Sequence, residues 1–96
     1  MSKQQQTRLW ASLHRRQKIV REFLLPCTQT DALSNGLVAS CKAFDISVPI
    51  VLAKHHRELG QFSRTDFTQK DFMDAFPYTR LSIEIFGEDE AGPVRD

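Results

Sequence analysis

The fold class depends most on residues 8–25, RLWASLHRRQKIVREFLL, a stretch that contains neither glycine nor proline. As a single helix, it would place four large aliphatic side chains on one face: Leu9, Leu13, Val20 and Leu24. As a β-hairpin, residues 9–14 would alternate between two faces and residues 15–18 would form a polar turn. Residues 19–25 would then supply the β-branched and aromatic side chains typical of a strand. The turn lacks the Asn-Gly or Asp-Gly pair that favours a hairpin, so the pattern leaves both structures open.

The main helix is predicted over residues 31–45. Leu33, Leu37, Cys41 and Phe44 recur there at helical spacing, and Thr28 or Thr30 can accept an N–H of the first turn. Gly36 opposes this prediction, because glycine inside a helix costs about 1 kcal/mol relative to alanine.

The second half of the chain predicts shorter elements. In order, they are a buried strand (48–53), a short helical turn ended by Gly60 (54–62), a brief strand (64–67), a short helix with Phe72, Met73 and Phe76, and a final strand (80–86). Residues of the final strand alternate between two faces, with Leu81, Ile83 and Ile85 on one and Arg80, Ser82 and Glu84 on the other. Thr68-Gln69-Lys70-Asp71 resembles a capping box with Asp in place of Glu. Four phenylalanines are expected to pack this half onto the sheet: Phe62, Phe67, Phe72 and Phe76.

Four short motifs are similar to a group of small bacterial proteins to which no activity is assigned. They are Leu9-Trp10 followed by Lys18-Ile19-Val20-Arg21, Pro49-Ile50-x-Leu52-x-Lys54-His55-x-Arg57-Glu58, Phe62-x-Arg64-Thr65-x-Phe67, and Arg80-Leu81-x-Ile83-Glu84. The resemblance implies that the chain opens with a β-hairpin, and it implies no site. The Asn35-Gly36 pair departs from the group's pattern.

Together these observations predict a single α+β domain over residues 8–86, with flexible tails at 1–7 and 87–96. A mixed sheet would pack on one main helix. The order hairpin, helix, then two or more strands is similar to the β-grasp, or ubiquitin-like, topology, an analogy that implies no function.

Composition narrows the class of protein. A length of 96 residues excludes a multi-domain enzyme, and 41% hydrophobic with 26% charged residues is ordinary for a globular chain. No apolar run approaches the ~20 residues of a membrane-spanning helix, and the polar first seven residues are unlike a signal peptide. The two cysteines fit a reducing compartment. We therefore expect a cytoplasmic protein without membrane contact.

Basic residues concentrate near the N-terminus. Residues 1–27 carry a net charge of +5 and the remainder −4, which gives the chain its net +1. Four basic residues could meet phosphates around the predicted hairpin, where Trp10 could stack on a base: Arg15, Arg16, Lys18 and Arg21. The near-neutral total charge opposes nucleic-acid binding, and a basic turn also protects a sheet edge from unwanted pairing.

Residues 54–58, Lys-His-His-Arg-Glu, are the richest in reactive groups. A histidine and a glutamate three residues apart share a helical face, as in some metal sites. However, a metal site needs at least three converging ligands, so His55, His56 and Glu58 are only weak candidates and a solvated segment is the alternative. Cys27 and Cys41 lack zinc-site spacing. Cys27 beside a helix N-terminus could have a lowered pKa, but no catalytic motif is present. We expect neither cofactor nor catalytic residue.

These observations favour a non-catalytic domain that binds a protein partner or a second copy of itself. Contact would occur through a sheet edge or through Trp10 and Phe86, which are expected to face outward. One alternative is nucleic-acid binding through the basic hairpin. The other is a small metal-binding or enzymatic site in residues 54–58.

Overall fold

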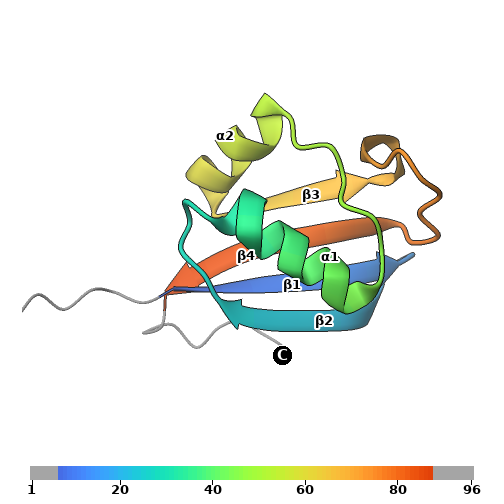
Figure 1. The fold of residues 1–96 in the computed structure, drawn as a ribbon, viewed down its shortest axis with the longest axis horizontal. Helices are drawn as coiled ribbons and strands as arrows, with labels where there is room; N and C mark the ends of the chain where they lie inside the picture. The colour runs from blue at the N-terminus through green and yellow to red at the C-terminus, as the bar shows by residue number, and fades with distance from the viewer. Residues whose placement is uncertain (1–6, 88–96) are drawn as a thin grey trace, which may run out of the picture.

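The computed structural model describes residues 7–87, which form a four-stranded sheet and two α-helices (Figure 1). In chain order the elements are β1 (Thr7–Arg15), β2 (Lys18–Pro26), a π-helical turn (Ala32–Gly36), α1 (Leu37–Phe44), α2 (Ala53–Phe62), β3 (Arg64–Thr68), a 3-10 turn (Gln69–Asp71) and β4 (Arg80–Gly87). The fold class is α+β, as predicted.

Residues 8–25 form the hairpin and not the helix. β1 and β2 pair antiparallel, with Arg15 opposite Lys18 on either side of the turn. The pairing buries Leu9, Ala11 and Leu13 on one face of β1, as their alternation predicts. Burial of this face favours the strand over the helix, because a helix would spread the same residues around its circumference.

The strand order is β2-β1-β4-β3, and every pair in it is antiparallel. The expectation of a mixed sheet is therefore wrong, and the β-grasp topology is not confirmed. β2 follows β1 through a tight turn and β4 returns beside β1 in the opposite direction, so antiparallel pairing results.

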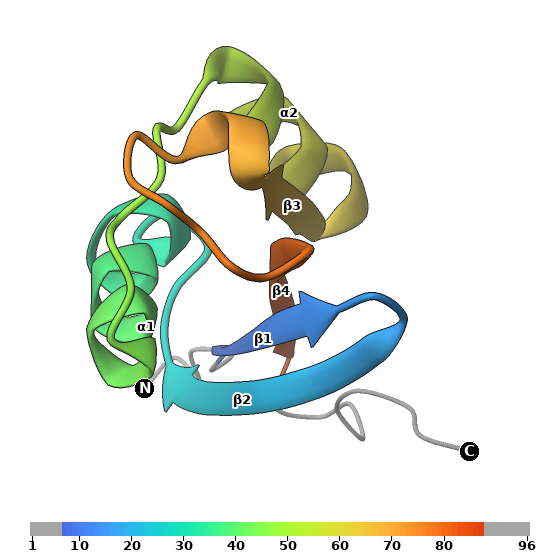
Figure 2. The same cartoon turned by 90° about the vertical axis from the view of Figure 1, so that its right-hand side faces the viewer.

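α1 and α2 lie on the same side of the sheet (Figures 1 and 2). The core forms between this layer and the inward residues of the strands, which include Leu81, Ile83 and Ile85 of β4. The predicted helix over residues 31–45 is present, but its first turn is π-helical.

Gly36 joins the π-helical turn to α1, and it is buried. A Cβ built on it would lie 2.7 Å from Leu9 Cδ1 and 2.8 Å from Cys27 Sγ. Its φ of −65° is helical, so glycine is needed here for the close approach of β1 and not for an unusual backbone conformation.

Residues 48–53 do not form the predicted strand. Residues 48–52 belong to the connection from α1 to α2, and Ala53 begins α2. None of the described strands pairs with residues 48–52, and their one backbone-to-backbone donor among the described residues is the Ile50 N–H, which bonds the Asp71 carbonyl at 2.7 Å. Pro49 is buried, whereas its neighbours in the alternating pattern face outward. The apolar composition of residues 48–53 predicted a strand buried on both faces, but the segment is an extended connection with one side exposed.

Three other predictions for this half also need correction. Gly60 does not stop the helix, because α2 continues to Phe62 and ends at Ser63 in the left-handed conformation. Phe62 is 70% exposed, since Leu59 is the last buried residue of α2. The capping box at Thr68 is present, but it begins only the 3-10 turn Gln69–Asp71. The predicted short helix with Phe72, Met73 and Phe76 does not form, and Met73 is 82% exposed.

The predicted tails, 1–7 and 87–96, lie outside the described residues except for Thr7 and Gly87, which end β1 and β4. Within residues 7–87, neither helix has the length and apolar character needed to cross a membrane.

Candidate functional site

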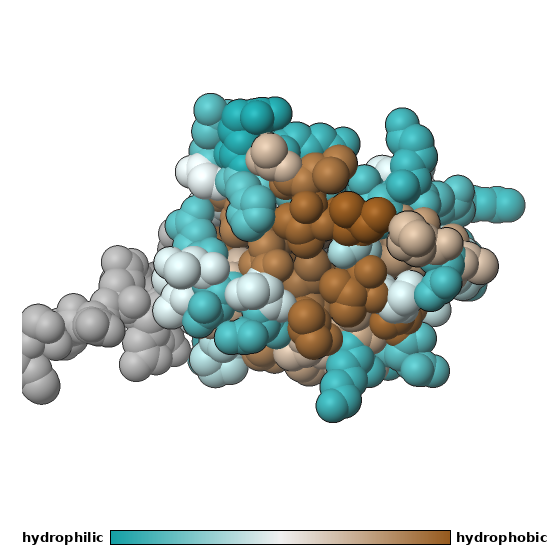
Figure 3. Space-filling model, turned by 45° about the horizontal axis from the view of Figure 1, so that its top comes forward, coloured by the Kyte–Doolittle hydropathy of each residue, from teal (hydrophilic) through white to brown (hydrophobic). Residues whose placement is uncertain are grey.

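The side of the molecule that carries the helices exposes a set of large aliphatic side chains. Four of them, 44–50% exposed, lie on α1 and on the connection to α2: Val38, Val48, Ile50 and Leu52. We call these four residues the apolar surface. Figure 3 shows hydrophobic side chains forming a continuous area on this side of the molecule, with polar residues around it.

Local geometry explains why these side chains face solvent. In the extended connection, successive side chains alternate in direction, so Pro49 and Val51 turn toward the protein while Val48, Ile50 and Leu52 turn away. The Ile50 N–H bonded to Asp71 holds the connection in place. A continuous exposed hydrophobic area of this kind typically marks an interaction site, whereas single exposed hydrophobic residues are common on any protein surface.

The hairpin turn presents the predicted basic residues around a hollow of about 600 Å³, lined by Arg15, Arg16, Gln17, Lys18 and Val20. The Arg16 N–H donates to Thr79 Oγ1 at 2.6 Å, and the Thr79 N–H donates to the His14 carbonyl at 2.6 Å. The Arg15 guanidinium lies 5.0 Å from the centre of the Tyr78 ring. The turn is therefore anchored to residues 78–79.

Arg21 does not join these residues. Its Nη2 donates to the Ala43 carbonyl at 3.3 Å, and its guanidinium lies 5.5 Å from the centre of the Phe44 ring. It thus binds one of the last carbonyl groups of α1, which have no partner within the helix.

Trp10 and Phe86 share the face of the sheet opposite the helices. Trp10 is paired with Glu84 and Phe86 with Arg8, so the two aromatic residues are diagonal neighbours on β1 and β4. Both are partly buried, and Trp10 Nε1 donates to Glu22 Oε1 at 2.9 Å. Their role as partner contacts stays a prediction.

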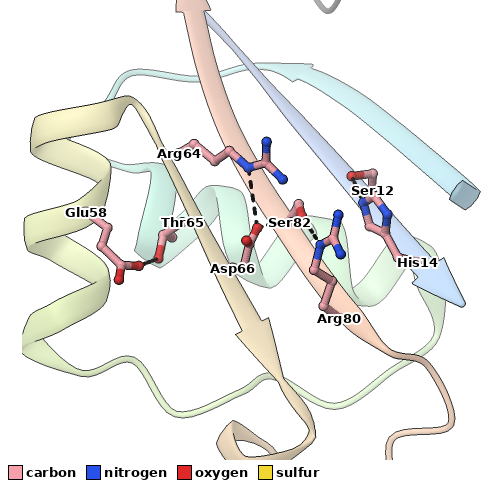
Figure 4. Close-up of polar contacts among 8 residues, drawn as sticks. All are labelled: Ser12, His14, Glu58, Arg64, Thr65, Asp66, Arg80 and Ser82. Atoms are coloured by element: carbon pink, nitrogen blue, oxygen red, sulfur yellow. Dashed lines mark hydrogen bonds and ion pairs between the residues drawn. The ribbon is translucent and has the colours of Figure 1, made fainter. Parts of the chain in front are cut away.

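The same face carries a polar network across three strands (Figure 4). Asp66 Oδ1 accepts from Ser82 Oγ at 2.6 Å and lies 3.5 Å from Arg64 Nε. Ser82 Oγ also accepts from Arg80 Nε at 3.3 Å. On β1, Ser12 Oγ and His14 Nε2 are 2.9 Å apart.

The pKa of His14 lies below its usual 6.5, first because burial disfavours the charged ring and then because Arg80 repels a second positive charge. Arg64 acts in the same direction and Asp66 opposes both. The histidine, the two arginines and the aspartate therefore interact electrostatically as one cluster. Sequence alternation had placed Arg80 and Ser82 on this face, but nothing in it indicated that β3 would bring Arg64 and Asp66 beside them.

Residues 54–58 do not converge on a point. The His55 ring is buried and stacks on Phe67 with ring centres 4.2 Å apart, His56 is exposed, and Glu58 Oε1 accepts from Thr65 Oγ1 at 2.7 Å. Among residues 7–87, no group of three or more His, Cys, Asp or Glu side chains could hold a metal ion.

Both cysteines are free thiols. Burial raises the pKa of Cys41 to about 11. Burial also raises the pKa of Cys27, with a contribution from Asp31, so the expected lowering at a helix N-terminus is wrong. Its Sγ donates to the Thr28 carbonyl at 3.3 Å and does not face a free helix end.

Comparison with known proteins identifies no relative, and the resemblance to small bacterial proteins stays a prediction. No protein-family model, curated protein or solved structure matches this chain.

Proposed function

We propose that this protein is a protein-binding domain and that its binding site is the apolar surface. The observation that supports this most directly is the alternation in residues 48–52, which turns Val48, Ile50 and Leu52 outward together. Complete burial of an aliphatic side chain contributes roughly 1.5–3 kcal/mol. Side chains that are half exposed therefore retain a large part of this free energy for a partner.

The charges near the apolar surface favour a particular partner. Three exposed basic residues lie on the two helices that the connection joins, Lys42 on α1 and Lys54 and Arg57 on α2, against one exposed acidic residue, Asp45, at the start of the connection. A second copy would bring these basic groups near their own equivalents, which costs free energy. We therefore propose a different protein whose apolar segment is bordered by Asp and Glu.

A random-peptide display library tests the site and the partner chemistry together. Peptides selected on the wild-type protein should combine apolar residues with acidic flanks. Their affinity should fall roughly tenfold to hundredfold in Ile50→Asp, because a charge would have to be buried at the interface. Val20→Asp on β2 is the matched control, since Val20 is exposed to a similar degree and lies outside the apolar surface.

Two outcomes would overturn this proposal. One is selection of peptides that bind Ile50→Asp and the wild-type protein equally. The other is a wild-type dimer, measured by light scattering, that Ile50→Asp converts to a monomer, because the occupant would then be a second copy.

The proposed cytoplasmic location is supported by the two free thiols.

Nucleic-acid binding is a second candidate, favoured by the anchored basic turn. Arg15, Arg16 and Lys18 line one hollow, and the two hydrogen bonds through Thr79 reduce the freedom that the turn would lose on binding. A labelled single-stranded oligonucleotide should bind at low salt and weaken steeply as salt rises. Arg16→Glu with Lys18→Glu should abolish binding and Arg57→Glu should not. Absence of binding at about 50 mM salt would exclude this candidate.

A further inference from the structure

The network on the face opposite the helices holds two arginines by the same atom. Arg64 uses Nε toward Asp66, and Arg80 uses Nε toward Ser82. The two acceptors are themselves joined by the Ser82–Asp66 hydrogen bond. The four side chains thus form a single chain of contacts across β3 and β4, from one guanidinium to the other.

This arrangement leaves the outer end of each guanidinium available. Among residues 7–87, the terminal Nη atoms of Arg64 and Arg80 have no hydrogen-bond acceptor. Figure 4 shows both guanidinium groups on this face, with His14 beside Arg80. A guanidinium held through Nε presents its two Nη groups as a fixed fork, the geometry that matches two oxygens of a phosphate.

We propose that Arg64 and Arg80, with His14 beside them, form a binding site for a phosphate group. Within the network, two guanidinium charges exceed the single charge of Asp66, and no described helix covers this face (Figure 2). Glu84 on β4 is the cross-strand partner of Arg64, and Glu22 on β2 is paired with Ser12. The excess of positive charge is therefore greatest at the end of the sheet where Arg80 pairs with His14.

His14 adds a response that a simple basic patch would lack. With the site empty, burial and the two arginines disfavour its protonation, and only Asp66 favours it. A bound phosphate would offset the arginine charges, so the pKa of His14 should rise when phosphate binds. His14 would then become a third cation facing the ligand.

Titration of the labelled protein with inorganic phosphate, followed by NMR, tests the site. Saturable shifts should appear at residues 12–14, 64–66 and 80–82, and the same ionic strength of sodium chloride should not produce them. Arg64→Gln and Arg80→Gln should each weaken binding roughly tenfold to hundredfold, whereas the exposed Arg57→Gln should have no effect. Because either variant could unfold, the His14 ring signals of the wild-type protein supply a second readout.

An oligonucleotide arm distinguishes the source of the phosphate. Competition between inorganic phosphate and oligo-dT for the same signals, lost in Arg80→Gln, would extend the site to the phosphates of a nucleic acid. Phosphate binding without competition would assign it to small phosphorylated ligands. The proposal is overturned by a response that sodium chloride reproduces, by binding that persists in folded Arg80→Gln, or by a His14 pKa that phosphate leaves unchanged.

Discussion

His55 Nε2 lies 3.7 Å from Asp71 Oδ2, and both side chains are buried. His55 Nδ1 accepts the Leu52 N–H at 2.9 Å, so the neutral ring carries its proton on Nε2. Asp71 Oδ2 accepts the Thr68 N–H at 2.9 Å. The pair therefore links the start of α2 to the turn after β3, although Nε2 itself has no hydrogen-bond partner.

This pair predicts that the protein loses stability in mild acid. Burial lowers the pKa of His55 from 6.5, with Lys54 acting in the same direction and Asp71 and Glu58 opposing it. The unfolded chain thus binds a proton near pH 6.5 while the folded chain does not. The stabilising contribution is complete above that pH and is lost as the pH falls toward the folded-state pKa. The lowered pKa of His14 acts in the same direction.

Urea unfolding between about pH 7.5 and pH 5 measures this effect. The free energy of unfolding should fall by at most about 1.4 kcal/mol per pH unit for each histidine. His55→Gln should reduce the slope. A slope that is zero, or that is identical in His55→Gln, would contradict the assignment to this residue.

Gly36→Ala should destabilise the fold by about 1–3 kcal/mol, the usual cost of an extra methyl group in a packed core. The new Cβ would overlap Leu9 Cδ1 and Cys27 Sγ, both closer than 3 Å to its built position. Thermal or urea unfolding measures the change. An alanine variant as stable as the wild-type protein would show that the Leu9 and Cys27 side chains can move aside at little cost.

Gly60→Ala should have the opposite effect on stability from Gly36→Ala. Gly60 lies inside α2, is exposed, and has no atom within 4 Å of a built Cβ. Alanine should therefore raise the free energy of unfolding by about 0.5–1 kcal/mol, because glycine loses more backbone freedom on folding. If this variant is destabilised, α2 must have a neighbour at Gly60 that residues 7–87 do not supply.

Arg21→Gln tests whether Arg21 stabilises the fold and takes no part in nucleic-acid binding by the basic turn. Loss of the bond to the Ala43 carbonyl and of the contact with Phe44 should cost about 0.5–1.5 kcal/mol of stability. Any oligonucleotide affinity should remain nearly that of the wild-type protein. An affinity loss as large as that of Arg16→Gln would instead place Arg21 in the nucleic-acid surface.

Arg16→Gly should stabilise the hairpin. Arg16 has a φ of 60°, which glycine adopts without the steric cost that a Cβ imposes. The gain should be a few tenths to about 1 kcal/mol in urea unfolding, since the Arg16 N–H to Thr79 is retained. Arg16→Ala keeps the Cβ and is the control. Equal stability of the two variants would show that the turn is unstrained.

Sequence patterns predicted local structure most reliably where the pattern depends on residues close together in the chain. The alternation of Leu81, Ile83 and Ile85 predicted β4, and the Thr68–Asp71 spacing predicted the capping box, because both depend on residues close in the chain. The pattern failed for residues 48–53, where an apolar run does not reveal whether another strand will lie beside it.

The choice between hairpin and helix in residues 8–25 was also beyond local pattern, since both periods fit the same leucines. Pairing of β1 with β4, far along the chain, accompanies the hairpin. Local spacing thus predicted the main helix and the final strand, whereas the hairpin with its basic turn was implied by the resemblance. Only the packing of distant segments brought β3 with Arg64 beside β4 with Arg80, turned His55 inward and left Val48, Ile50 and Leu52 in solvent. These outcomes depend on which surfaces meet when the helices pack on the sheet.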